Sequence, residues 1–153
     1  MIIRYYQAWK TFKLPKFILI SVLWSFLLGF PLALLIFEAF GVVDEEVGSA
    51  GLENSGIVSA FFAAVIVAPI LETFICQTIP IVVVQKFNIG LQRIMALTLS
   101  TLIFASIHLG YSIWYAILIF PSGLILAEAY LIFQNRKEPS FWVVTAIHAL
   151  RKT

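Results

Sequence analysis

The sequence has few charged residues for its length. Of its 153 residues, 61% are hydrophobic and only 12% are Asp, Glu, Lys or Arg, whereas soluble domains carry roughly 25% charged residues. The mean hydropathy of +1.01 agrees with this shortage. An ordinary soluble domain is therefore excluded, and the composition indicates an integral membrane protein.

Cysteine is scarce as well. The single cysteine, Cys76, excludes a disulfide within one chain and does not indicate a compartment. Because its neighbours are apolar and none is cationic, we expect a buried, unreactive thiol. The chain also lacks internal repeats, and the lack of inverted-repeat halves disfavours a secondary transporter.

Long apolar runs fill most of the chain. Four candidate membrane spans cover residues 17–40, 56–84, 94–108 and 113–133, since a span needs about 20 mostly apolar residues. The last segment, residues 140–153, is long enough for half a bilayer at most. We therefore expect an all-α membrane bundle of four spans plus a short C-terminal half-helix, folded as one domain over residues 1–153.

Lysine and arginine are missing from one set of loops. The loop of residues 41–55 contains four acidic residues and no Lys or Arg. Eight of the ten basic residues lie at the other ends of the spans: Arg4, Lys10, Lys13, Lys16, Lys86, Arg93, Arg136 and Lys137. Since cytoplasmic loops carry an excess of Lys and Arg, we expect a cytoplasmic N-terminus and an external 41–55 loop. Residues 1–16, which are basic and aromatic, are expected to lie at the cytoplasmic interface.

Few ionisable residues remain inside the apolar runs. Apart from Glu38, which lies close enough to the end of the first run to reach the outer interface, they are Glu72, His108, Glu128 and His148. Such groups cost free energy in hydrocarbon unless they find partners. Contact in one interior cavity would satisfy Glu72, His108 and His148 together, although each histidine taken alone could equally be an interhelical hydrogen-bonding residue.

The local spacing supports such a cavity. Pro69 lies three residues before Glu72, where it removes a backbone donor and is expected to kink the span and leave room for water. Phe104 and His108 are four residues apart and so share a helix face. Glu72 could then act on a water as a general base. Glu128, near the cytoplasmic end of its span, is expected to snorkel or to pair with a basic residue of the C-terminal end, Arg151 or Lys152.

Three segments in this order resemble the CPBP family of intramembrane proteases. They are APILETFICQ from Ala68, FASIHLG from Phe104, and GLILAEAYLIFQNRKEPSFWVVTAIHAL from Gly123. The family pattern is EExxxR after Ala-Pro, then FxxxH, then HxxxN, and the resemblance covers residues 64–150. The family includes CAAX prenyl endopeptidases and bacterial proteins tied to bacteriocin processing or self-immunity. It implies a protease-like core over residues 64–150 in a bacterial inner membrane.

The resemblance implies roles for three residues. Glu72 matches the family glutamate that activates water, and His108 and His148 match the histidines that hold the water and stabilise the oxyanion. The need for a metal is left open. Two histidines and a carboxylate are compatible with zinc or another divalent metal, but no HExxH spacing favours one, so no cofactor is assigned.

Three positions depart from the family pattern. Thr73 stands in place of the second glutamate and Gln77 in place of the arginine, so a charged pair has become a neutral pair that can still form a hydrogen bond. Lys152 stands in place of the asparagine. Its ammonium could serve as an oxyanion donor, but snorkelling to the cytoplasmic interface is the favoured expectation.

Three functions remain as alternatives. The first is an intramembrane endopeptidase that uses a Glu72-activated water to hydrolyse a peptide bond of a membrane-associated protein or peptide, prenylated in the CAAX-type case. The second is a catalytically inactive or weak family member that acts as an immunity or partner-binding membrane protein. The third is a small transporter or channel component with Glu72 as its ion site. The expected partners are the lipid bilayer and a peptide or protein in it, with no nucleic acid.

Overall fold

The computed structural model describes the backbone of residues 2–42, 56–87 and 90–152, and the side chains from Gln7 onward. Most of the acidic loop predicted to lie outside the membrane, including all four of its acidic residues, falls outside the described residues. The described part of the chain consists of helices joined by short connections and contains no strand.

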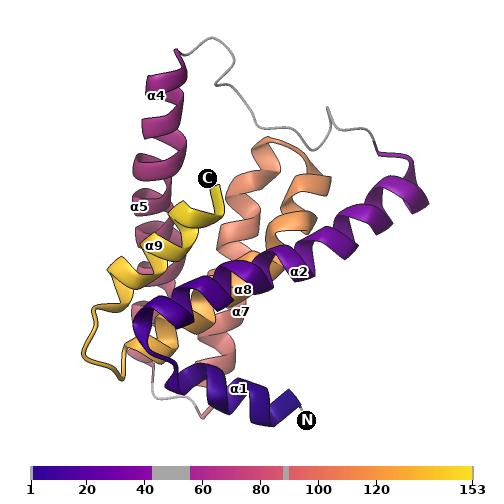
Figure 1. Ribbon diagram of the computed structural model, residues 1–153. Coiled ribbons are helices and arrows are strands. Elements are labelled where there is room, and N and C mark those ends of the chain that lie inside the picture. The colour runs from indigo at the N-terminus through magenta and orange to yellow at the C-terminus, as the bar shows by residue number, and fades with distance from the viewer. Residues whose placement is uncertain (1, 43–55, 88–89, 153) are drawn as a thin grey trace.

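Four helical segments are long and apolar enough to cross a membrane. A short helix, α1 (Ile2–Thr11), precedes the first span, α2 (Leu14–Phe40). The second span consists of five consecutive helical segments: α4 (Ile57–Phe61), η1 (Phe62–Val67), α5 (Ala68–Glu72), η2 (Thr73–Thr78) and α6 (Ile79–Gln85). The third span is α7 (Gln92–Ile107) together with η3 (His108–Gly110), and the fourth is α8 (Ile113–Phe133). The C-terminal half-helix is α9 (Ser140–Lys152). The predicted all-α bundle of four spans is confirmed (Figure 1).

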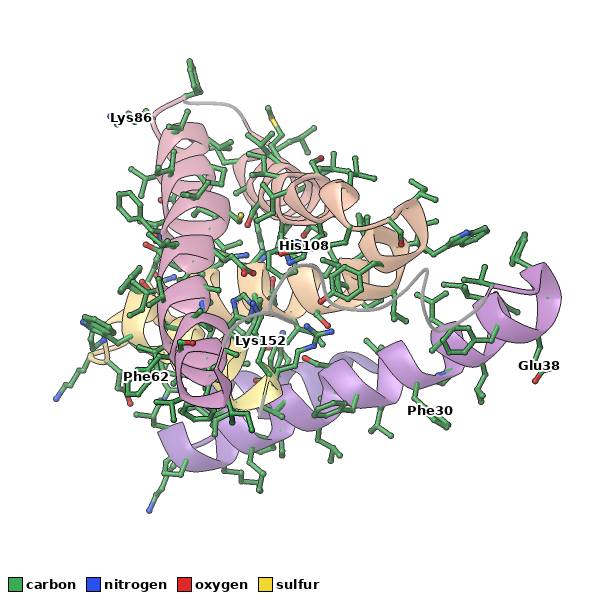
Figure 2. The ribbon with its side chains drawn as sticks, turned by 90° about the horizontal axis from the view of Figure 1, so that it is seen from above. Phe30, Glu38, Phe62, Lys86, His108 and Lys152 are labelled. Carbon is green, nitrogen blue, oxygen red and sulfur yellow. The ribbon has the colours of Figure 1, made fainter. Side chains whose placement is uncertain are left out.

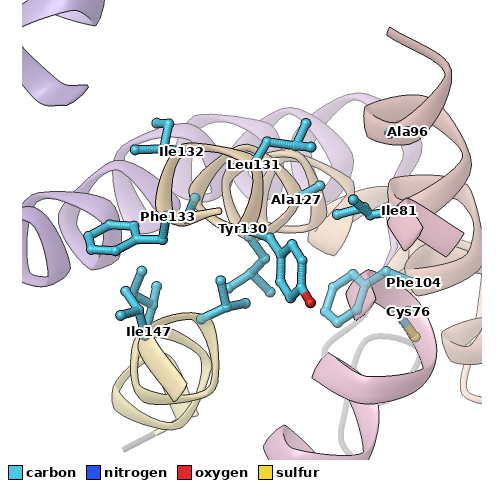
Figure 3. Close-up of a cluster of buried hydrophobic side chains, with 14 of the residues drawn as sticks. Cys76, Ile81, Ala96, Phe104, Ala127, Tyr130, Leu131, Ile132, Phe133 and Ile147 are labelled. Carbon is cyan, nitrogen blue, oxygen red and sulfur yellow. The ribbon is translucent and has the colours of Figure 1, made fainter. Parts of the chain in front are cut away.

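Helix α8 lies at the centre of the bundle. Its most apolar stretch is 67% buried, compared with 11% for α2 and 11% for the second span, so those two spans expose most of their side chains to lipid. The core gathers side chains of α8, α9, α7, α6 and the start of α2 (Figure 3). Its largest fully buried members are Phe17, Phe104 and Phe133.

The two ends of the bundle differ in charge. At one end, Gln85 and Gln134 hydrogen-bond to each other, and Arg136 donates to the carbonyl of Phe12 at 2.9 Å. We call this the basic end, because the Lys and Arg residues outside α9 lie there. At the other end, here called the distal end, the rings of Phe40 and Trp114 lie 5.0 Å apart. The spans therefore alternate in direction as the sequence predicts.

Prolines shape the second span without breaking it. The helical conformation continues from Ile57 to Gln85, but two wide π segments, η1 and η2, each end two residues before a proline, Pro69 and Pro80. Proline cannot donate a backbone hydrogen bond, and π turns are common where the regular ladder is interrupted. The expected disturbance at Pro69 thus takes the form of wide turns on both sides of the five-residue helix that ends at Glu72.

Candidate active site

Three helices bring Glu72, His108 and His148 to one point. The Nε2 atom of His148 lies 3.2 Å from Glu72 Oε2, and the Nε2 atom of His108 lies 3.6 Å from the same oxygen. Both imidazoles are almost completely buried and the carboxylate is 14% exposed. One carboxylate oxygen therefore faces two imidazole nitrogens in the middle of the bundle.

Local structure places each of these side chains. Glu72 is the last residue of α5, directly before the π turn of η2. His108 begins the 3-10 turn η3, where α7 ends, and His148 lies in the last turns of α9. The buried ring of Phe104 packs against both imidazoles, with ring centroids 4.9 Å from His108 and 5.4 Å from His148. Phe104 thus fixes the two histidines relative to each other.

The hydrogen bonding of His108 determines what its Nε2 atom can do. Its Nδ1 atom lies 2.7 Å from the carbonyl oxygen of Phe104, and a carbonyl only accepts, so Nδ1 carries the hydrogen. In the neutral ring, Nε2 is then an acceptor that faces a second acceptor, Glu72 Oε2. Two acceptors at 3.6 Å repel unless a donor joins them, and a water that gives one hydrogen to each meets this need.

His148 offers a complementary group. Its Nε2 atom is close to Glu72 Oε2 but not aligned with it as a hydrogen bond, and among the described residues neither atom, nor His148 Nδ1, has a hydrogen-bond partner. Buried polar atoms without partners are rare and often mark an unseen water or a catalytic role. The unpaired atoms of Glu72 and His148 thus lie where His108 would also hold a water.

Lys152 does not snorkel to the basic end, contrary to the sequence-based expectation. Its Nζ atom donates to Glu72 Oε1 at 2.8 Å, and the two side chains are only 20% and 14% exposed. The buried carboxylate attracts the ammonium because an unpaired charge there would be costly. The residue that departs most from the family pattern is therefore part of the site.

A cavity of about 570 Å³ opens onto this cluster, a size typical of ligand pockets. It is lined by Phe26, Ala63, Ala64, Ala68, Glu72, His108, Tyr111, Tyr115, Arg151 and Lys152. Figure 2, which looks down on the distal end, shows His108 and Lys152 in the space between the second span and α2. The cavity is large enough for a peptide segment beside the carboxylate.

Thr73 and Gln77, the other two departures, lie next to the site and are fully buried. The hydrogen bond that the sequence allows between them is not formed, since neither side chain has a partner among the described residues.

The structure also shows where Glu128 and Cys76 lie, which bears on what the sequence predicted for each of them. Glu128 pairs with Arg93 of α7, so the predicted pairing with Arg151 or Lys152 is wrong; those two residues line the cavity instead. The α9 helix carries them toward the distal end, away from Glu128. Cys76 is fully buried and unbonded, as expected for a structural thiol.

The side chains of the site do not form a set that fits a metal ion. His108 has one feature of a metal ligand, because its Nδ1 hydrogen goes to a carbonyl and leaves Nε2 free. However, the Lys152 ammonium holds one oxygen of Glu72, and no group of three His, Cys, Asp or Glu residues in the described ranges has an arrangement that would hold a metal. With Lys152 in this position, the set does not fit a divalent cation.

The sequence analysis did not assign three polar residues of the cavity wall to the site. The rings of Tyr111 and Tyr115 lie 5.7 and 5.5 Å from the His108 ring, and Arg151 lines the same cavity. The signal for the tyrosines is the short connection after His108, which must fold the start of α8 back over the end of α7. No comparable signal marks Arg151, because its position depends on how α9 docks.

Comparison with known proteins identifies the family of the chain. No match was found among the curated proteins or among the solved structures. A family profile described as Rce1-like type II CAAX prenyl endopeptidase matches residues 54–153, which include Glu72, His108, His148 and Lys152. The resemblance noted in the three motifs is confirmed. The chain belongs to the Rce1-like family of type II CAAX prenyl endopeptidases.

Proposed function

We propose that this protein is a glutamate-dependent intramembrane peptidase. The observation that carries the proposal is Glu72 Oε2, which faces His148 Nε2 at 3.2 Å and His108 Nε2 at 3.6 Å beside a cavity. Membership of a CAAX protease family supports hydrolysis rather than a non-catalytic role. The substrate class is a membrane-associated peptide or protein, and a prenylated one is a special case suggested by the family name.

In the proposed reaction, Glu72 removes a proton from the water as the water attacks. The water oxygen forms a bond to the carbonyl carbon of the scissile peptide, and the carboxylate receives one proton. His108 Nε2 positions the same water, because its Nδ1 hydrogen is already committed to the Phe104 carbonyl. The product of this step is a tetrahedral adduct with a negative oxygen.

Two groups are placed to stabilise that oxygen. His148 can carry its hydrogen on Nε2 and donate it, and the Lys152 ammonium supplies a fixed positive charge near Glu72. Donors that are held in place before the reaction stabilise the developing charge at little reorganisation cost. The adduct then breaks its carbon–nitrogen bond, and the proton held by Glu72 passes to the leaving amine.

The proposal also assigns a role to each part of the chain. Residues 64–150 form the peptidase core, within the single domain of residues 1–153, and the match over residues 54–153 supports this assignment. Residues 1–16 lie at the cytoplasmic interface of a bacterial inner membrane. The distribution of Lys and Arg along the chain supports the cytoplasmic orientation.

Substitution of Glu72 by Gln tests the proposal. The amide keeps the shape of the side chain and cannot act as a base, so we expect hydrolysis to fall at least a hundredfold, as is typical of losing a general base. The assay uses purified protein in liposomes with a panel of membrane peptides that carry a fluorophore and a quencher. Cleavage is followed by fluorescence and confirmed by mass spectrometry.

Glu128→Gln is the matched control. Glu128 is also a carboxylate inside an apolar span, but it pairs with Arg93 at the basic end and lies outside the Glu72 cavity. We expect this variant to cleave as fast as the unaltered protein. Equal rates in the Glu72→Gln and Glu128→Gln variants would contradict the proposal.

A further inference from the structure

Three basic side chains from distant parts of the sequence meet at one cavity of the basic end. The cavity has a volume of about 300 Å³, at the lower limit of ligand pockets. We call it the basic pocket; it is lined by Lys10, Arg93, Leu131, Ile132, Asn135 and Arg136. Its walls come from the end of α1, the start of α7, and the end of α8 with the turn that follows (Figure 1). None of these residues lines the Glu72 cavity, so the basic pocket is separate from the candidate active site.

Arg136 builds the basic pocket by joining α1 to the end of α8. Its Nη1 atom donates to the carbonyl oxygens of Phe12, at 2.9 Å, and Lys10, at 3.4 Å. Trp9 also holds this part of the chain, because its Nε1 atom donates to the hydroxyl of Ser21 in α2 at 3.3 Å. The end of α1 that carries Lys10 is therefore held against the bundle by hydrogen bonds.

The basic pocket carries an excess of positive charge. Among the described residues, no Asp or Glu lines it. Glu128 pairs with Arg93, and Glu138 pairs with Arg136 at 3.3 Å. With Lys10, three cations thus stand against two carboxylates. A guanidinium has five N–H donors, more than one carboxylate can accept, so both arginines are also able to donate to a second anion.

The surroundings of the basic pocket add to this excess. Lys13, Lys86 and Lys137 are exposed at the same end of the bundle. Residues 88–89, which lie outside the described ranges and join the second span to the third, carry no charge. The acidic segment of residues 43–55 is joined to α2 and α4 at the distal end (Figure 1). The field of the basic end therefore attracts an anion.

The position of the basic pocket favours a lipid as the source of that anion. Its three basic residues lie at the ends of helices, where lipid headgroups meet a membrane protein. Leu91 and Ile94, on either side of Arg93 in the sequence, are 60% and 61% exposed. An acyl chain could cover this apolar surface while the headgroup of the same lipid occupies the pocket. A second cavity of about 170 Å³ shares Arg93 and Asn135 with the pocket and gives room for the rest of a headgroup.

We propose that the basic pocket binds the phosphate of an anionic phospholipid, with Lys10, Arg93 and Arg136 as the groups that hold it. Arginine forms short, paired hydrogen bonds to phosphate oxygens as it does to carboxylates, and basic pockets between membrane helices are suited to anionic headgroups. The bound lipid joins α1 to α7 and α8, so it stabilises the folded bundle. The proposal does not depend on peptide hydrolysis, because no residue of the pocket belongs to the Glu72 cavity.

Native mass spectrometry of the full chain in detergent tests the proposal. The protein is titrated with dioleoylphosphatidylglycerol, which is anionic, or with dioleoylphosphatidylcholine, which is zwitterionic. The fraction of protein that carries one lipid gives an apparent dissociation constant. We expect the anionic lipid to bind about fivefold more tightly, or better. Glycerol phosphate, a soluble phosphate ester, is added as a competitor, and we expect it not to displace the lipid at equal concentration.

Lys10→Gln removes one cation from the pocket. We expect this variant to bind phosphatidylglycerol about fivefold more weakly, the effect of one cation close to an anionic headgroup, and Lys10→Arg to retain the binding. Lys137→Gln is the matched control, because Lys137 is an exposed lysine of the same end that does not line the pocket. We expect its loss to be much smaller than that of Lys10→Gln.

A double variant, Arg93→Gln with Glu128→Gln, gives a second test. It removes the ion pair as a whole, so no carboxylate is left without its partner, and it takes one arginine from the pocket. We expect weaker binding of phosphatidylglycerol, whereas Glu128→Gln alone keeps the arginine and should bind at least as tightly as the unaltered protein. Melting temperatures in detergent show whether each variant is folded.

Equal affinities for the two lipids would overturn the proposal. Equal losses in Lys10→Gln and Lys137→Gln would also overturn it, because the attraction would then belong to the whole basic surface and not to the pocket. Displacement of the lipid by glycerol phosphate at equal concentration would show that the pocket takes a soluble phosphate ester, and the lipid assignment would be wrong.

Discussion

At the scale of the residue, Lys152 departs from the family pattern and yet is accommodated in the site by an ion pair with Glu72. An asparagine at this position would bring no charge, but the lysine brings an ammonium that lies 2.8 Å from Glu72 Oε1. The pair is largely shielded from water, so each charge depends on the other for compensation. The charge of the carboxylate is balanced by Lys152, and neither imidazole needs to be protonated for that purpose.

The pair predicts a coupling between these two positions. Lys152→Met keeps the length of the side chain and removes its charge, which leaves the carboxylate uncompensated. We expect the melting temperature in detergent to fall by several degrees, and to fall much less when the same change is made in a Glu72→Gln background. The difference corresponds to a coupling of about 0.5–3 kcal/mol, the range found for contacting residues.

Lys152→Arg is the control, because it keeps the charge and can still pair with Glu72. We expect it to retain most of the stability. A lysine that snorkelled to the interface would give equal effects of Lys152→Met in both backgrounds, and that result would show that the ion pair does not form.

At the scale of the element, a side chain of α7 hydrogen-bonds to the backbone of the second span four residues before Pro80. In a regular α-helix, Pro80 would leave the carbonyl of Cys76 without a backbone donor. Ser100 of α7 supplies the hydrogen instead, with its Oγ atom 2.7 Å from that oxygen in a fully buried position. The side chain of one helix thus completes the hydrogen bonding of another, close to the site.

Ser100→Ala is expected to destabilise the protein by about 1–3 kcal/mol, because it leaves a buried carbonyl unsatisfied. Thermal unfolding in detergent measures the loss. Ser106→Ala is the comparison, since the Ser106 hydroxyl bonds to Leu102 of its own helix at an exposed position. Equal melting temperatures for the two variants would argue against a structural role for the bond from Ser100 to Cys76.

A glycine sets the distance between α7 and α8. A Cβ atom at Gly123 would lie 2.9 Å from the Phe104 ring and 3.2 Å from the Thr101 methyl. Phe104 is fully buried and packs on both histidines, so it cannot move away without disturbing them. The close approach of the two helices therefore helps to hold the site in shape.

Gly123→Ala is expected to destabilise by about 1–3 kcal/mol through overpacking and to lower peptide cleavage through displacement of Phe104. Gly29→Ala in α2 is the matched control, since nothing lies within 4 Å of the added methyl there. Melting temperature and cleavage rate are measured for both. Unchanged cleavage in a folded Gly123→Ala variant would show that the ring position does not matter for the reaction.

At the scale of the whole molecule, the fold follows closely from the pattern of the sequence. The four apolar runs, interrupted by short polar connections, predict four spans in alternating directions, and the structure has them. This works because a membrane admits few ways to satisfy the backbone, so apolar length alone identifies a spanning helix. The boundaries shift by a few residues; α2 begins at Leu14 and the third span ends at Gly110.

The packing of the spans was less predictable. The sequence could not indicate that α8 is the buried centre, because its composition resembles that of the lipid-facing α2. Nor could it indicate that Glu128 pairs with Arg93 rather than with the C-terminal basic residues. Both depend on which helix faces meet, and an apolar face looks the same whether it meets lipid or another helix.

By itself, the sequence determined the class of the protein, the number and alternation of its spans, and the short set of polar residues that had to find partners within the bundle. These follow from the cost of placing charge and backbone in hydrocarbon. Only the tertiary structure decided that Lys152 lies on Glu72, that Phe104 supports both histidines, and that Tyr111, Tyr115 and Arg151 line the cavity beside them. The reason is that these features depend on where α9 docks between the spans, and no local pattern in its thirteen residues encodes that position.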